Sequence, residues 1–68
     1  MNEEVFNLEV RQFLKKFGIT AQREIEKAVD GAIKTGKLKG TEKVRARAVL
    51  SLEGLPGEIK VEGEIALA

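Results

Sequence analysis

The hydrophobic period of the chain changes at Gly40, and this change constrains the fold more than any other feature of the sequence. Before Gly40, apolar residues recur every three or four positions, which is typical of a helix with one buried face. After Gly40 they occupy every second position, as in a strand with one face in the core and one in water. The two sets are Ile25, Ala28, Val29, Ala32 and Ile33 for the helical period, and Val44, Ala46, Ala48, Leu50 and Leu52 for the alternating one. The sequence therefore predicts helices followed by strands.

The helical part is predicted to contain two helices, over residues 3–17 and 21–35. Asn2 is suited to cap the first helix, whose apolar stripe holds all three aromatic residues of the chain. Gly18 and Thr20 are expected to end one helix and begin the next, because glycine accepts the left-handed cap and threonine is a common N-cap. A link this short makes the two helices antiparallel or steeply crossed neighbours.

The remaining part is predicted to be an antiparallel hairpin whose first strand begins near residue 41. Residues 54–57, Gly-Leu-Pro-Gly, have the composition of a turn, since proline presets φ and glycine accepts positive φ. A four-residue loop there pairs Glu53 with Glu58 and places Leu50 opposite Val61. The expected fold class is α+β in the order α-α-β-β, with both helices packed on one face of the hairpin.

The chain is expected to form a single small domain over residues 1–68. A domain of this size buries only about 60% of the surface that its unfolded chain exposes, so its stability is marginal. It has no cysteine and no histidine, and its carboxylates are not spaced like a cation-binding loop, which leaves good packing or self-association to stabilise it. The predicted core consists of Phe6, Val10, Phe13, Leu14, Phe17, Ile25, Val29, Ile33, Leu50, Leu52, Ile59, Val61 and Ile65.

The side chains that perform most enzymatic chemistry are missing from this sequence. Without histidine or cysteine there is no ordinary nucleophile–base pair, and Ser51 is the only serine. Glu62 and Glu64 share one strand face, but the register places Arg45 and Arg47 across from them. A solvated row of cross-strand ion pairs is therefore the simpler interpretation. We expect no enzymatic activity, no cofactor and no bound metal.

Half of the basic residues fall between positions 34 and 47, where Glu42 is the only acidic residue. A loop rich in glycine and lysine beside a strand edge can contact phosphates. No aromatic residue is interleaved to stack on unpaired bases, and a solvated loop that protects a sheet edge is the simpler interpretation. Nucleic-acid binding is therefore the alternative function. Its candidate contacts are Lys34, Lys37, Lys39 and Lys43.

Residues 14–28, LKKFGITAQREIEKA, have some of the features of a helix-turn-helix. Gly18 and Thr20 match the turn of that motif. Glu24, however, occupies a position that is normally apolar, and the recognition helix would bring several carboxylates close to phosphates. An ordinary helical hairpin is the preferred interpretation.

Four apolar residues are predicted to lie outside the core, namely Val5, Leu8, Val49 and Leu55. Leu8 falls in the middle of the polar face of the first helix, and a two-stranded hairpin is marginal alone, with both edges open. Pairing of two copies edge to edge would bury one edge of each, whereas helices of the same chain covering the hairpin would make these residues incidental. We hypothesise a non-catalytic interaction module, homodimeric or bound to a protein partner, with these residues as its interface.

Three segments of the chain carry a family resemblance: MNEEVFNLEVRQFLKKFGITAQREIEKAV, the loop GKLKG, and a C-terminal segment ending VEGEI. On these segments the chain resembles a family of short, uncharacterised proteobacterial proteins. The resemblance implies a small α+β domain of bacterial origin, and it brings no activity and no site residues. The acidic start and the lack of a long apolar run separately predict a cytoplasmic protein without a membrane segment.

Overall fold

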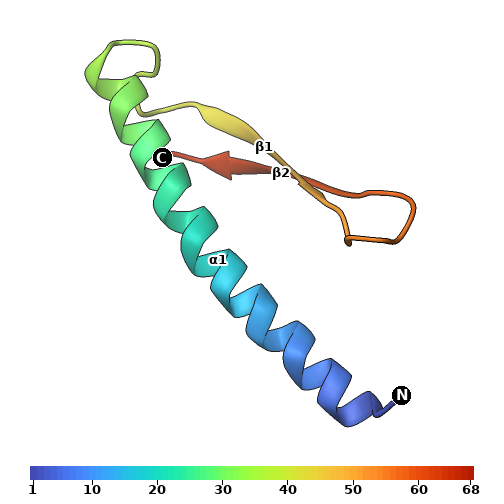
Figure 1. Ribbon diagram of the computed structural model, residues 1–68. Helices are drawn as coiled ribbons and strands as arrows, with labels where there is room; N and C mark the ends of the chain where they lie inside the picture. The colour runs from blue at the N-terminus through green and yellow to red at the C-terminus, as the bar shows by residue number, and fades with distance from the viewer. The chain divides into compact units, whose positions relative to one another are not determined.

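The computed structural model describes residues 1–68 and contains one helix followed by a two-stranded sheet (Figure 1). Helix α1 spans Glu3–Lys34, and strands β1 and β2 span Lys43–Leu50 and Ile59–Ala66. The chain divides into two compact units, Met1–Lys37 with the helix and Leu38–Ala68 with the hairpin. The fold is α+β in the order α-β-β, because the predicted pair of helices is a single helix.

Helix α1 continues without interruption through the link that was predicted to separate two helices. Gly18 and Thr20 lie in its interior, so the predicted α-α-β-β order with two packed helices is wrong. Positive φ is confined to Gly36, Gly40, Gly54 and Gly57, and Gly18 does not adopt the left-handed conformation of a helix cap. The physical reason is that one interior glycine costs about 1 kcal/mol, whereas a break would expose the backbone groups of two additional helix ends to water.

The N-terminal end of α1 is capped as the sequence predicts. Asn2 has an extended backbone, and its side-chain oxygen accepts a hydrogen bond from the amide of Val5 at 3.1 Å. Glu3 and Glu4 follow in the first turn, where the helix dipole favours negative charge. These contacts fix the start of the helix.

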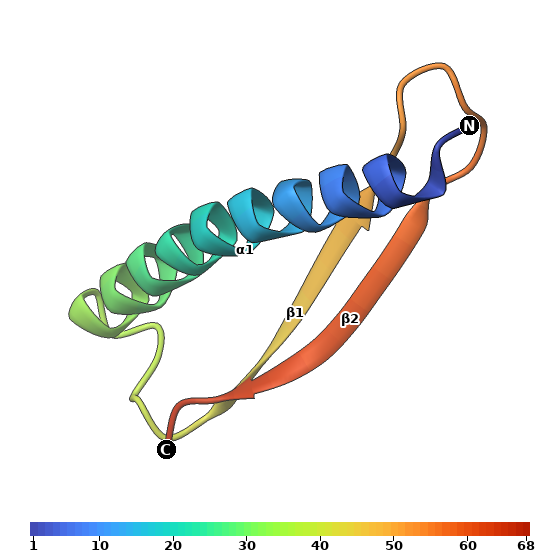
Figure 2. The ribbon, with the colours of Figure 1, turned by 90° about the horizontal axis from the view of Figure 1, so that it is seen from below.

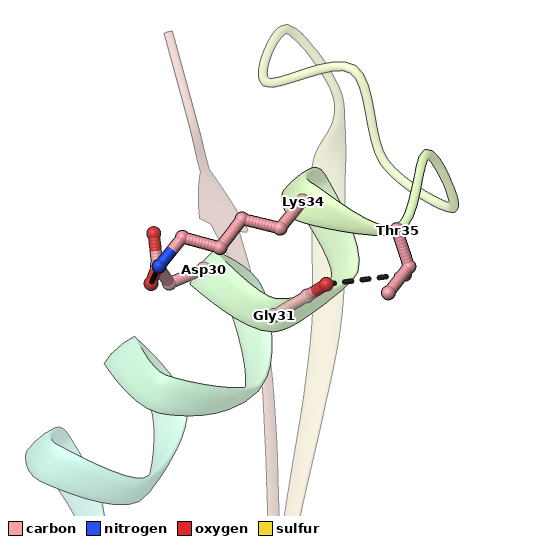
Figure 3. Close-up of polar contacts among 4 residues, drawn as sticks. All are labelled: Asp30, Gly31, Lys34 and Thr35. Atoms are coloured by element: carbon pink, nitrogen blue, oxygen red, sulfur yellow. Dashed lines mark hydrogen bonds and ion pairs between the residues drawn. The ribbon is translucent and has the colours of Figure 1, made fainter.

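The C-terminal end of α1 is closed by backbone hydrogen bonds around Gly36, where the helix was predicted to stop. The amide of Gly36 (φ 81°) donates to the carbonyl of Ile33 at 3.1 Å, and the amide of Lys37 donates to that of Ala32 at 2.8 Å. This pair of bonds is the Schellman arrangement, which needs a residue with positive φ. The Thr35 hydroxyl adds a bond of 3.1 Å to the carbonyl of residue 31, beside an ion pair between residues 30 and 34 (Figure 3).

Strands β1 and β2 form an antiparallel ladder in which Leu50 pairs with Ile59 (Figure 2). The sequence predicted Val61 opposite Leu50 and a pairing of Glu53 with Glu58, so the predicted register is wrong by two residues. The connecting loop covers residues 51–58, and its turn is closed by a 3.1 Å hydrogen bond from the amide of Leu55 to the carbonyl of Leu52. A shift of two residues keeps every side chain on its original face, so the apolar alternation does not distinguish the two registers.

No side chain is buried anywhere in the chain. Members of the predicted core on α1 are accessible to water: Phe6 is 51% exposed, Phe13 is 53% exposed and Val10 is 37% exposed. Residues of β1 alternate between exposed and half-buried, which confirms the predicted two faces of this strand. Each unit thus has regular secondary structure and an apolar face that is largely accessible to water.

Candidate interaction surfaces

Helix α1 carries a continuous apolar stripe, which consists of Phe6, Val10, Phe13, Leu14, Phe17, Ala21, Ile25, Ala28 and Ala32. Its pattern returns after eleven residues, so that Phe6, Phe17 and Ala28 are equivalent positions, and the exception is Phe13, whose equivalent is Glu24. An eleven-residue repeat corresponds to about 3.67 residues per turn, close to the 3.6 of a straight helix. The stripe therefore stays near one side of α1 for almost its whole length.

The large side chains of this stripe were predicted to lie in a core, but on two separate helices, so that the single surface they form was not predicted. The signal that reveals it is the spacing across Gly18. Phe17 and Ala21 are four residues apart, and Ile25 follows after four more, so the helical phase continues through the predicted break. The prediction of two helices relied instead on Gly18 and Thr20, which are common residues at helix ends.

The four apolar residues predicted as an interface are exposed, and they lie on three different elements. Val5 and Leu8 lie on α1, Val49 lies on β1, and Leu55 lies in the loop between the strands. Leu8, at 55% exposed, is hardly more accessible than Phe6 of the stripe. Exposure alone therefore does not distinguish this predicted interface from the stripe, and the interface stays a prediction.

The loop end of the hairpin has a shallow hollow of about 220 Å³ beside Leu55. Its lining comes from the ends of the two strands and from their connection, and includes Leu50, Leu52, Pro56 and Ile59. Pockets for small molecules usually have volumes of about 300–1,000 Å³. The hollow is thus smaller than a typical ligand site, and no three acidic side chains are grouped to hold a metal ion.

The polar face of the hairpin contains the predicted row of arginines and glutamates. Arg45 lies opposite Glu64 in the register, and Arg47 lies opposite Glu62. The ion pair forms diagonally between Arg45 and Glu62, whose side chains are both accessible to water. Because exposed pairs contribute only about 0–1 kcal/mol, this row supports the hairpin modestly. Ser51 lies just beyond β1 and is exposed.

The four lysines predicted to contact phosphates lie around the junction of the two units. Lys34 ends α1 and is paired with Asp30 at 3.0 Å, while Lys43 begins β1. Lys37 and Lys39 lie in the connecting segment. The single acidic residue of this segment, Glu42, is directly involved in its conformation.

The carboxylate of Glu42 accepts hydrogen bonds from three successive backbone amides. Its oxygens lie 2.8 Å from the amide of Lys39, 2.9 Å from that of Gly40 and 3.1 Å from that of Thr41. Successive amides of this kind form an anion-binding nest. The amide of Lys39 above all, then that of Glu42 itself and those of Gly40 and Thr41, hold the pKa of the Glu42 carboxyl below its ordinary value. The nest that suits a phosphate is therefore filled by a carboxylate of the same chain.

Helix α1 is not apolar enough to span a membrane, and the chain has no other helix.

Comparisons with curated proteins and with solved structures found no match. A protein-family model, in contrast, matches residues 1–68 and describes a family of unknown function. The predicted resemblance to an uncharacterised family is thereby confirmed, and nothing in the match concerns a proteobacterial origin. The chain belongs to the DUF6494 family of unknown function.

Proposed function

We propose that this protein is a non-catalytic interaction module that completes its fold by covering the apolar stripe of α1 through self-association or with a protein partner. The observation that carries the proposal is that the large apolar side chains of a 32-residue helix are exposed while no residue of the chain is buried. Burial of one large apolar side chain contributes about 1.5–3 kcal/mol. Covering a stripe of this length would therefore stabilise the folded protein considerably.

Neither unit has enough local stability to make this covering unnecessary. Helices in water gain most of their stability from packing of the apolar face, and an isolated two-stranded hairpin is marginal at best. The hairpin strands have eight residues each and are about 26 Å long. Helix α1, with 32 residues, is about 48 Å long. A surface the size of this hairpin can cover little more than half of the stripe.

The test is the mass of the protein by light scattering over a range of concentrations, combined with its helical content by circular dichroism. We expect an oligomer whose helical content falls when dilution dissociates it, because the stripe then returns to water. A monomer that keeps its helix and unfolds cooperatively would overturn the proposal. The variant Leu8→Glu tests the sequence-predicted interface: weaker association assigns Leu8 to the contact, and an unchanged mass removes it.

The alternative function, nucleic-acid binding through the lysines between positions 34 and 43, gains no support from the local contacts. Glu42 fills the amide nest of this segment, and Asp30 pairs with Lys34. Binding of this kind depends on phosphate neutralisation and weakens steeply with salt. A titration that shows no binding of duplex or single-stranded nucleic acid at low salt would exclude it.

A further inference from the structure

The stripe of α1 has large side chains in its N-terminal half and mostly small ones in its C-terminal half. Phe6, Phe13 and Phe17 belong to the first half, whereas Ala21 and Ala28 belong to the second. Two copies packed in parallel would place large side chains against large ones and alanines against alanines. One end would then be overpacked and the other would contain voids, and both defects are destabilising.

An antiparallel arrangement of two copies places three of the large side chains opposite alanines. If Phe17 lies opposite Ala21 of the second copy, Val10 lies opposite Ala28, and Phe6 lies opposite Ala32. The residue numbers of each of these pairs sum to 38. In the same register Phe13 lies opposite Ile25 and Leu14 lies opposite Glu24. The size complementarity therefore holds for three of the five large side chains in the N-terminal half, with position 19 of each copy at the two-fold axis.

The charges beside the stripe agree with the same register. Glu9 comes next to Lys27 of the second copy, and Lys16 comes next to Glu24. These pairs have residue numbers that sum to 36 and 40, close to the value given by the apolar pairs. Both join opposite charges.

A parallel pair of copies does not give this agreement. It brings Lys16 beside Lys15, a pair of like charges, and Glu9 beside Arg11, a pair of opposite charges. Charges on the flanks of paired helices commonly determine orientation and partner choice. The charge pattern therefore favours the antiparallel orientation independently of side-chain size.

We infer that the partner of the α1 stripe is a second copy of this chain, bound antiparallel with Phe17 opposite Ala21 and Glu9 beside Lys27. This inference rests on the proposed function, since it names the occupant of the same surface. The eleven-residue repeat adds that the two helices run nearly straight beside each other or with a slight right-handed supercoil.

The chain has no cysteine, so a single introduced cysteine carries a spin label at one defined position per copy. In the antiparallel pair, Asn7→Cys labels lie 24 helical positions apart, which is about 36 Å along the axis at 1.5 Å per residue. Thr20→Cys labels are the matched control, because they lie only two positions apart, about 3 Å along the axis. We therefore expect a long distance at position 7 and a short one at position 20.

The outcomes separate the inference from the proposed function. A dimer with short distances at both positions is parallel and overturns the inference, while the proposed function stands. A dimer in which the labels at position 20 are not the closer pair also overturns it. A folded monomer overturns both.

Exchange of charges gives a second measurement. Glu9→Lys or Lys27→Glu alone is expected to weaken dimerisation about fivefold, and the double variant is expected to restore it.

Discussion

Replacement of Gly18 by alanine distinguishes a continuous α1 from two helices with a break. Gly18 lies 15 residues after the start of α1 and 16 before its end, so it is fully interior and not part of a frayed terminus. A Cβ atom at this position meets nothing within 4 Å, and the φ of Gly18 is not positive. No steric penalty therefore opposes the gain in helix propensity.

The expected magnitude is the full propensity difference between glycine and alanine, about 0.8–1.0 kcal/mol of added stability per chain. For a domain of this size, 1 kcal/mol raises the melting temperature by about 4–8 °C. The assay is thermal unfolding followed by the helical signal in circular dichroism, at a fixed protein concentration because association contributes to the melting temperature.

The matched control is Gly36→Ala, which also has space for a Cβ atom but has a φ of 81°. A residue with a side chain is strained in this left-handed conformation by about 1–2 kcal/mol, so the control is expected to lower the melting temperature. If Gly18→Ala lowers it as well, Gly18 also adopts a cap conformation, and the reasoning for a continuous helix is refuted.

Two further substitutions test the contacts described above. Phe17→Glu places a charge in the middle of the stripe and is expected to weaken self-association more than a hundredfold, because two large apolar side chains per dimer lose their burial. Gln12→Glu, outside the stripe, is the control. Equal masses of the two variants by light scattering would contradict the prediction. Because the pKa of Glu42 is lowered in the folded state, its contribution to hairpin stability is fully present above the ordinary glutamate pKa of about 4.3 and is lost as the pH falls through the lowered value. Glu42→Gln should therefore destabilise the hairpin near neutral pH and reduce its sensitivity to acid, as measured by urea unfolding at several pH values, and an unchanged acid profile would exclude this role.

The features that depend on neighbouring residues could be predicted from the sequence. The helical and alternating periods gave the correct order of helix before hairpin, and Asn2 and Gly36 gave the two ends of the helical region. The row of arginines and glutamates on the hairpin also followed from the alternation. In each case the interactions join residues that lie a few positions apart or on adjacent strands, so the local pattern contains the information.

The errors arose where two arrangements differ little in local chemistry. Gly18 followed by Thr20 satisfies the rules for a helix end and a helix start, yet one interior glycine costs only about 1 kcal/mol, so the continuous helix is preferred. The hairpin register was wrong by two residues because such a shift keeps Leu50 and its neighbours on the same face. The predicted core joins residues of the helix to residues of the hairpin, and packing of one element on another is not specified by any local pattern.

The error at Gly18 and the antiparallel pairing are related. A chain that folds back at residues 18–19 would bring Phe17 to Ala21 and Phe6 to Ala32 within one copy, and these are the pairs that two continuous helices form between copies. The two arrangements differ only in the connection, which is the relation between a monomer and a domain-swapped dimer. The sequence therefore has complementary residues on the two sides of position 19. Because residues 18–19 continue the helix, these residues pair between two copies and not within one.

This relation predicts the effect of lengthening the link. Insertion of a flexible Gly/Ser segment of about four residues between Gly18 and Ile19 gives the chain a loop long enough to fold back, since helix–helix connections commonly have two to eight residues. We expect the mass by light scattering to fall from that of a dimer to that of a monomer, with most of the helical content kept. The same insertion placed after Gly36, outside α1, is the control and should leave the mass unchanged. A dimer that survives the first insertion, or a monomer that loses its helix, would show that the antiparallel pairs do not hold these helices together.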